Sequence, residues 1–362
     1  MPFVVGFEQH RADEANDAVL VGEDADDIGT AFHFLVQPFE RIGAVELGAV
    51  LHRKRLSGLR RVRNASNMPI ASGDDDDRLC LPATSPVPSI ALNDGPAMAT
   101  IGFGTYRLNG SAGVEGIAAV FEPGYRLLDS AFNYENEGAL GAAIRTASVP
   151  REELRVTSKL PGRHQHFEDA ITTIEESLYR AQLDYYDLYL IHWPNPSQGL
   201  YVETWRALIE ARKRGLVRSI GVCNFLPAHL EKIMSETGVA PVVNQVELHP
   251  YFPQAEQRAF DKAYGIVTQS WSPLGRANQL LREPAIKTIA DRLGRTIGQV
   301  ILRWHVQLGA VPLPKATSKE RQIENLLLFD FELSSDDMSS IATLARPDGR
   351  TFDQDPAHYE EL

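Results

Sequence analysis

Short runs of apolar residues alternate with longer amphipathic segments from about residue 88 onward. The segments between the short runs repeat apolar residues at helical spacing, as Ile171, Ile174, Leu178 and Ala181 do within 168–181. The segment 201–215 is similar and ends in a glycine. Repeated βα units of this kind predict a parallel sheet covered by helices. The short runs that we interpret as buried strands are 125–130, 155–159, 188–192, 219–222, 242–247, 266–271 and 310–314.

A β-hairpin is predicted where this region begins. Residues 89–95 alternate apolar positions and end in Asn93-Asp94-Gly95, which is a hairpin turn signal. Residues 99–105 are either the partner strand or the next strand of the sheet. With a strand near Ile101 the βα region holds eight strands, and eight suggest a closed barrel. The predicted fold class is therefore α/β, a (β/α)8 TIM barrel with an N-terminal β-hairpin.

Almost every predicted strand ends in a residue suited to chemistry or binding. A (β/α)8 barrel gathers the carboxyl ends of all its strands into one pocket. A doubly wound sheet would gather them only near its switch point, so the barrel is the better fit. The residues at or just past successive strand ends are Asp129, Lys159, His192, Asn224, Gln245, Trp271 and Lys315.

Residues 1–87 follow a different pattern. Acidic and basic residues occur there in blocks, four aspartates stand at 74–77, and few windows sustain any periodicity. Three interpretations stay open: a disordered extension, a small regulatory module, or an upstream stretch that the mature protein lacks. The weak periodicity favours the third, with the start of the protein near Met68. The predicted organisation is a low-order extension over 1–87 and a single barrel domain over 88–362.

Composition narrows the class of protein. The 362 residues are 43% hydrophobic, and no apolar run approaches the roughly 18 residues of a membrane span. The formal net charge of −12 argues against nucleic acid as a partner. Two cysteines can form neither a disulfide framework nor a cysteine-based zinc site, which favours a reducing, cytoplasmic compartment. His164 and His166 lack a nearby carboxylate-rich motif, so no metal site is expected.

Four residues together suggest acid–base chemistry. Tyrosine is a poor acid near neutrality because its ordinary pKa is about 10. An ammonium group such as that of Lys159 would lower the pKa of Tyr134, and Asp129 could hold the lysine charged and in place. His192 could then hydrogen-bond a substrate carbonyl, which suits proton donation to an oxygen whose carbon receives hydride. Each of the four residues taken singly could have a purely structural role. Because all four lie at or near the ends of predicted strands, a chance arrangement is a poor explanation.

The sequence also resembles the aldo-keto reductase superfamily from about Ser89 to the C-terminus. The stretch 124–137, with Asp129 and Tyr134 five residues apart, looks like the family signature. The lysine strand at 156–160 and the histidine strand at 184–194 match in order, and 221–225, 244–250 and 314–325 match its cofactor motifs. The resemblance implies that Tyr134 is the general acid, tuned by Lys159 and Asp129, and that His192 orients the carbonyl.

The same resemblance implies an NADPH/NADP site. Asn224 and Gln245 would hold the nicotinamide carboxamide, and Trp271 would stack on the ring. The loop from Ser270 to Gly275 would grip the pyrophosphate. The close spacing of Lys315, Lys319 and Arg321 independently suggests a positive site for a 2′-phosphate, and hence a preference for NADPH over NADH. The predicted cofactor-binding residues are Asn224, Gln245, Trp271, Ser272, Leu274, Lys315, Arg321, Glu324 and Asn325.

Two departures from the family pattern stand beside these matches. Cys223 occupies a position where the family commonly has serine, and Ala316 follows Lys315 where serine is usual. Each removes a hydroxyl that could contact the cofactor. The thiol of Cys223 has no obvious base in its local sequence, so we do not expect it to act as a nucleophile.

The expected function is NADPH-dependent reduction of aldehyde and ketone carbonyls to alcohols. Trp271 and the short C-terminal tail look most like the bacterial 2,5-diketo-D-gluconate reductases, so that compound, related keto-sugars and α-dicarbonyls are candidate substrates. Tyr106 and Trp193 match substrate-pocket positions, and the short tail predicts few walls and broad tolerance. A non-catalytic NADP(H)-binding regulatory subunit is the alternative, against which the four intact residues argue. By resemblance, a monomer is expected.

Overall fold

The computed structural model describes residues 87–277, 279–352 and 354–361. The predicted extension over 1–87, including the candidate start at Met68, lies outside the described residues except for Val87. An eight-stranded parallel sheet runs through the described part of the chain in sequential order. Its strands are β3 (Phe103–Gly104), β4 (Leu127–Asp129), β5 (Arg155–Leu160), β6 (Tyr186–Ile191), β7 (Val217–Cys223), β8 (Val243–Glu247), β9 (Val267–Trp271) and β10 (Val311–Pro312).

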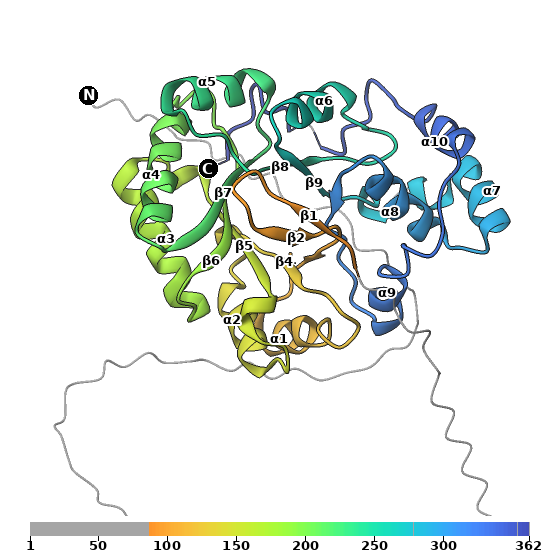
Figure 1. Ribbon diagram of the computed structural model, residues 1–362, viewed down its shortest axis with the longest axis horizontal. Coiled ribbons are helices and arrows are strands. Elements are labelled where there is room, and N and C mark those ends of the chain that lie inside the picture. The colour runs from red at the N-terminus through yellow and green to blue at the C-terminus, as the bar shows by residue number, and fades with distance from the viewer. Residues whose placement is uncertain (1–86, 278, 353, 362) are drawn as a thin grey trace, which may run out of the picture. The chain divides into compact units, whose positions relative to one another are not determined.

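The two edges of this sheet meet, which closes the barrel. The backbone N–H of Gly102 donates to the carbonyl of Pro312 at 3.0 Å, and that of Gly104 donates to the carbonyl of Pro314 at 3.1 Å. These bonds join β3 to β10, so the sheet has no free edge between them. The structure confirms the prediction of a TIM barrel, and Figure 1 shows its helices arranged around the strands.

Helices follow the strands and cover the outside of the barrel. In α3 the residues Ile171, Ile174, Leu178 and Ala181 are buried, as their spacing predicted. They share one core cluster with strand and helix residues such as Tyr189 and Trp205. The helices are α1 (Gly110–Ala118), α2 (Glu137–Thr146), α3 (Phe167–Ala181), α4 (Tyr201–Lys213), α5 (Pro227–Thr237), α6 (Ala255–Ala263), α7 (Pro284–Leu293), α8 (Ile297–Gln307), α9 (Lys319–Glu324) and α10 (Ser335–Ala342).

The predicted hairpin is present, with a shorter second strand than the sequence pattern indicated. β1 (Ser89–Ala91) pairs antiparallel with β2 (Ala97–Ala99). The stretch 99–105 is therefore divided: its first residue ends the hairpin, and Phe103–Gly104 is the first barrel strand. Leu92 and Met98 of the hairpin pack with residues that begin barrel strands. The hairpin thus packs against the amino ends of the strands, and Figure 1 shows it lying across the barrel.

Candidate active site

A buried ion pair lies at the carboxyl ends of β4 and β5. Lys159 Nζ donates to Asp129 Oδ2 at 2.8 Å and to the Ser130 carbonyl at 2.7 Å. Lys159 is fully buried and Asp129 nearly so. Burial is the largest single effect and disfavours the ammonium charge, but the charge and hydrogen bond of Asp129, together with smaller effects of Tyr134 and Cys223, raise the pKa of Lys159 above its ordinary value. The lysine therefore stays charged inside the barrel.

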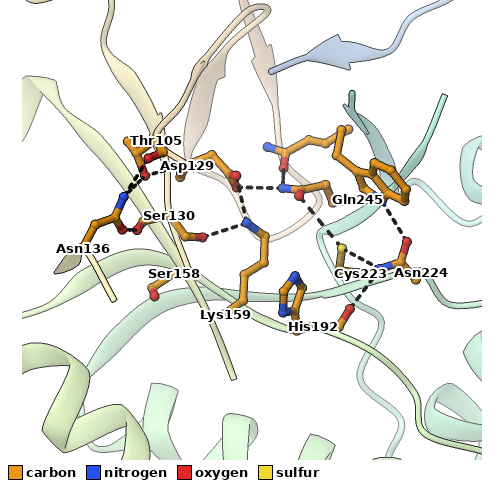
Figure 2. Close-up of polar contacts among 12 residues, drawn as sticks. Thr105, Asp129, Ser130, Asn136, Ser158, Lys159, His192, Cys223, Asn224 and Gln245 are labelled. Carbon is orange, nitrogen blue, oxygen red and sulfur yellow. Dashed lines mark hydrogen bonds and ion pairs between the residues drawn. The ribbon is translucent and has the colours of Figure 1, made fainter. Parts of the chain in front are cut away.

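Amide groups continue this polar cluster across the barrel (Figure 2). Gln245 Nε2 donates to Asp129 Oδ1 at 2.8 Å and to Gln269 Oε1 at 3.0 Å. On the other side, Thr105 Oγ1 donates to the Asp129 carbonyl, and Asn136 Nδ2 donates to the Thr105 carbonyl at 2.6 Å. The carboxylate of Asp129 is thus oriented by two donors, and its backbone is fixed from β3 and from the loop before α2.

Tyr134 lies beside this pair, in the short 3-10 helix η1 (Phe132–Tyr134) that follows β4. Its ring centroid is 5.0 Å from Lys159 Nζ and 6.1 Å from the centroid of His192. Burial raises the pKa of Tyr134 to about 12, although the charge of Lys159 lowers it in part. The lowering by Lys159 that the sequence predicts is present, but burial outweighs it, because the sequence pattern identifies the neighbouring charge and not the loss of water around the phenol.

Asn224 and Trp271 hold each other at the ends of β7 and β9. Trp271 Nε1 donates to Asn224 Oδ1 at 2.8 Å, while Asn224 Nδ2 donates to the His192 carbonyl and to Cys223 Sγ, at 3.0 and 3.2 Å. Asn224 has a left-handed φ of 63°, a conformation that asparagine tolerates better than most residues. Cys223, which stands where the family commonly has serine, thus accepts a hydrogen bond from Asn224. Burial raises the pKa of the Cys223 thiol, so the thiol stays protonated.

His305 of α8 supports the loop that follows β9. Its Nδ1 lies 3.1 Å from Ser270 Oγ and its Nε2 lies 3.2 Å from the Pro273 carbonyl. Because a carbonyl only accepts, the proton is on Nε2 and the Ser270 hydroxyl donates to Nδ1. Burial lowers the pKa of His305 to about 3, so the ring is neutral. The loop contains Ser272, a non-glycine residue with a left-handed φ of 48°.

Two cations stand at the other end of the site. Lys315 follows β10 and Arg321 lies on α9, and neither side chain has an ion-pair partner among the described residues. Lys319 does not belong with them: its Nζ lies 2.8 Å from Glu122 Oε2, and it does not line the cavity. The predicted three-residue positive site is therefore reduced to two. Glu324 accepts a hydrogen bond from Thr296 Oγ1 at 2.5 Å.

These groups surround one cavity of about 940 Å³. Lys159 is fully buried and does not line the cavity, although its partner Asp129 and its neighbour Tyr134 do. The structure thus brings the predicted catalytic, cofactor-binding and pocket residues together around this cavity, but not Lys319; their roles stay predictions. The predicted site residues that line the cavity are Tyr106, Asp129, Tyr134, His192, Trp193, Asn224, Gln245, Trp271, Ser272, Leu274, Lys315, Arg321, Glu324 and Asn325.

The family follows from comparison with known proteins. The sequence model of the Aldo/keto reductase family matches residues 100–346. This chain belongs to the aldo/keto reductase family. Its similarity to 2,5-diketo-D-gluconic acid reductase B of Corynebacterium sp. (strain SHS752001) is 52% identity over 276 residues, 76% of this chain and 99% of the relative. Methylglyoxal reductase DkgA of Salmonella typhimurium is 40% identical over 271 residues, 75% of this chain and 97% of that protein.

Solved structures agree with this family assignment. The chain is similar to an aldo/keto reductase from Brucella melitensis, with a TM-score of 0.69, 41% identity and coverage of 71% of this chain and 99% of that one. It is also similar to an aspartate-to-alanine mutant of Gox0644 in complex with NADPH, with a TM-score of 0.73, 40% identity and coverage of 76% and 100%. The resemblance drawn from the motifs is confirmed, and with it the class of enzyme.

Part of the cavity of this aldo/keto reductase was missed in the sequence. The C-terminal tail contributes Phe352, Tyr359 and Glu361 to the lining, and the rings of Trp193 and Tyr359 pack at a tilt of 54° with centroids 4.4 Å apart. The sequence predicted few walls from the short tail, and the tail itself forms one wall of this cavity; the broad substrate tolerance stays a prediction. Asn133, the neighbour of Tyr134, also lines the cavity. The tail has no periodicity that could have signalled this position.

The described residues contain neither a metal-ligand cluster nor a membrane-spanning helix. Within residues 87–361 as described, no group of three or more His, Cys, Asp or Glu could hold a metal ion. Over the same residues no helix is both long and apolar enough to cross a bilayer.

Proposed function

We propose that this enzyme reduces aldehyde and ketone carbonyls to alcohols with NADPH. The observation that carries the proposal is the buried ion pair of Asp129 and Lys159 beneath Tyr134 at one end of a large cavity. Burying the ammonium of Lys159 costs free energy, which its contact with Asp129 offsets. The ammonium lies 5.0 Å from the centroid of the Tyr134 ring, where its charge can stabilise a phenolate.

The residues lining the cavity fit NADPH. At one end, the side-chain amides of Asn224 and Gln245 and the indole of Trp271 suit a flat ring that bears a carboxamide. At the other end, the unpaired cations of Lys315 and Arg321 suit a 2′-phosphate dianion. The volume of about 940 Å³ lies in the upper part of the range for ligand pockets. When bound, the cofactor supplies the hydride that the carbonyl carbon receives.

The side chains of the protein would orient the carbonyl oxygen of the substrate and protonate it. His192 would donate a hydrogen bond to that oxygen and place it next to Tyr134. Tyr134 would give its phenolic proton to the oxygen, which becomes the alcohol hydroxyl, and would be left as a phenolate. The ammonium of Lys159 would stabilise this phenolate, and Asp129 would keep the ammonium in position.

The substrate class follows from the relatives and from the walls of the pocket. One relative is named a 2,5-diketo-D-gluconic acid reductase and another a methylglyoxal reductase. The rings of Tyr106 and Trp193 line the cavity beside Tyr134 and His192, and they suit small, flat dicarbonyl groups. We therefore propose 2,5-diketo-D-gluconate, related keto-sugars and α-dicarbonyls as substrates.

A substrate panel tests the proposal. The full chain is incubated with NADPH and with α-dicarbonyls, aldehydes and keto-sugars, while the absorbance of the reduced nicotinamide is followed. We expect oxidation of NADPH with α-dicarbonyls or keto-sugars. Binding of NADPH without turnover on any member would instead support the non-catalytic, cofactor-binding subunit. The retention of Tyr134, Lys159, Asp129 and His192 together in one site favours turnover.

The proposal also covers the oligomeric state and the cellular compartment of the protein. A monomer in the cytoplasm is expected by resemblance, and the free, buried thiol of Cys223 is compatible with a reducing compartment. Light scattering on the purified chain in the presence of NADPH tests the first part. A stable dimer would contradict it.

A further inference from the structure

The loop that carries Tyr134 is closed at its base by a hydrogen bond between its two ends. Ser130 follows the last residue of β4, and Asn136 precedes the first residue of α2. Ser130 Oγ donates to Asn136 Oδ1 at 2.7 Å, and both residues are buried (Figure 2). Tyr134 lies between them in the sequence, so its position depends on how this loop is held. Asn136 does not line the cavity, and nothing in the reduction described above requires it.

The side chain of Asn136 is not used to cap the helix that it precedes. Asparagine is favoured at the N-cap position because its side-chain oxygen accepts a backbone N–H of the first helical turn. Asn136 is the N-cap residue of α2, but its side chain makes no such bond. Its Oδ1 accepts from Ser130, and its Nδ2 donates to the Thr105 carbonyl at 2.6 Å and to Thr105 Oγ1 at 3.3 Å. The amide therefore joins the Tyr134 loop to the residue after β3, and helix capping does not explain it.

The same amide braces two residues that act on the buried ion pair. The carbonyl of Ser130 accepts a hydrogen bond from Lys159 Nζ at 2.7 Å. Thr105 donates to the Asp129 carbonyl from its backbone N–H and from its hydroxyl, each at 2.9 Å. Asn136 contacts Ser130 and Thr105 directly, so it links the acceptor of the lysine with the support of the aspartate backbone.

The direction of the lysine ammonium depends on the Ser130 carbonyl. An ammonium group has three N–H donors. One donates to Asp129 Oδ2 and one to the Ser130 carbonyl, which leaves the third for the phenol of Tyr134. Nζ of Lys159 lies 5.0 Å from the centroid of the Tyr134 ring. Burial raises the pKa of Tyr134, and the charge of Lys159 and a hydrogen bond from it act against that rise. A displaced Ser130 carbonyl would therefore turn the third N–H away from the phenol.

We propose that Asn136 is a positioning residue that holds the phenol of Tyr134 and the ammonium of Lys159 in the relative position that stabilises the phenolate. It acts through Ser130, whose hydroxyl closes the Tyr134 loop and whose carbonyl orients the lysine. Such geometry matters because a misplacement of about 1 Å can slow a reaction about 100-fold. No proton moves to or from Asn136 in this role. The inference deepens the proposed reduction and rests on it.

Two variants remove this hydrogen bond from its two sides. Asn136→Ala deletes the amide and takes the acceptor away from the Ser130 hydroxyl. Ser130→Ala deletes only the hydroxyl and keeps the backbone carbonyl, so it is the milder change. Gln307 of α8 supplies a matched control, because its side-chain amide also bridges backbone groups and it does not line the cavity. It accepts from the Leu333 N–H at 2.7 Å and donates to the Leu333 carbonyl at 2.9 Å.

The first arm of the test measures how firmly the loop is held and needs no turnover. Hydrogen exchange of the full-length protein is followed by mass spectrometry at peptides that cover residues 130–136. We expect these amides to exchange about 10-fold faster in Asn136→Ala than in wild type. Ser130→Ala should show the same change, and it replaces Asn136→Ala if that variant does not fold. Gln307→Ala should leave exchange in the loop unchanged. Exchange as slow as in wild type, in the variants that fold, would overturn the inference.

The second arm measures turnover with the best substrate of the panel, at a temperature where the variants compared are folded. Asn136→Ala is expected to lower kcat roughly 10- to 100-fold, while the KM for the substrate and the Kd for NADPH stay within about 3-fold. Ser130→Ala should change kcat in the same direction. Gln307→Ala should keep kcat within about 2-fold of wild type.

The outcomes of the second arm separate positioning from a purely structural role. A purely structural role for Asn136 predicts lower stability with kcat unchanged, and that result would overturn the inference. A rise in the Kd for NADPH as large as the fall in kcat would overturn it as well, because the whole site would then be disturbed. Wild type inactive on the whole panel would refute the proposed reduction instead. The exchange arm would still decide whether Asn136 holds the loop.

Discussion

Lys159 Nζ lies 2.8 Å from Asp129 Oδ2, and this pair is buried within the barrel. The two residues end neighbouring strands whose register places Asp129 opposite Thr157, two residues before Lys159. The contact is therefore a consequence of strand pairing, not of a flexible side chain finding a partner. The stability of the fold depends on both partners, because removing either charge would leave the other buried without a partner charge.

The first prediction concerns this ion pair. Asp129→Asn keeps the shape of the side chain but removes the negative charge, so the Lys159 ammonium is left unpaired and buried. We expect a loss of about 3 kcal/mol in the free energy of unfolding, measured by urea denaturation. Asp291→Asn is the matched control, since it breaks the exposed Lys287–Asp291 pair and should cost at most about 0.5 kcal/mol. Equal losses in the two variants would contradict the argument.

The second prediction concerns the proton donor. Tyr134→Phe removes the phenolic hydroxyl while leaving the ring that packs between Lys159 and His192. Turnover should fall roughly 100- to 10,000-fold, the usual contribution of a general acid. The quenching of NADPH fluorescence should be unchanged. Tyr179→Phe, at an 80% exposed position on α3, should behave as wild type in both measurements. A Tyr134→Phe enzyme with full activity would remove Tyr134 from the mechanism.

The pH dependence of reduction follows from the pKa of Tyr134. The protonated phenol is the active form in this direction, and burial raises its pKa to about 12. The active form therefore persists as pH rises and is lost only when pH passes through about 12. We expect kcat to show no alkaline decline from Tyr134 between about pH 7 and pH 10. A fall in kcat with a midpoint near pH 9 would contradict the raised pKa of Tyr134, provided that the protein is still folded at that pH.

The features that were predictable depend on patterns local in sequence. Apolar runs ending in Asp129, Lys159 or His192 identify strands together with the chemistry at their ends. The barrel fold then brings those ends together, whatever the helices between them contain. The matched motifs and the eight strands were sufficient for the fold class and the family, both of which are confirmed.

The features that were missed depend on contacts between distant segments. Glu361 reaches His192 only because Gly162 and Asn195 receive the tail, and no periodicity marks such a contact. Lys319 was assigned to the positive site by its spacing, but it pairs with Glu122 in the turn between α1 and β4. The net pKa shift of Tyr134 has the same origin, because burial is a property of the packed molecule.

The choice of cofactor gives the next prediction. Arg321→Ala removes a guanidinium that has no ion-pair partner among the described residues and can bind a 2′-phosphate through a fork of two hydrogen bonds. A charge-assisted interaction of about 1.5–3 kcal/mol corresponds to roughly a 10- to 100-fold rise in the Kd for NADPH. The Kd for NADH should not change, because NADH lacks that phosphate. Lys319→Ala is the matched control on the same helix, and its ion pair with Glu122 predicts little effect on either Kd. Equal weakening of NADPH and NADH by Arg321→Ala would contradict the assignment.

The last prediction concerns His305, which supports the loop after β9. Burial lowers the pKa of His305 to about 3, whereas an unfolded chain protonates histidine near pH 6.5. Between these values the unfolded state binds a proton that the folded state does not, so stability falls as pH decreases below about 6.5. From pH 6.5 to pH 5 this group alone should remove about 2 kcal/mol from the free energy of unfolding. His305→Gln can still accept from Ser270 and donate to Pro273, so urea denaturation should show a shallower loss over that interval. Identical pH slopes for wild type and His305→Gln would mean that the buried ring already carries its proton near neutrality.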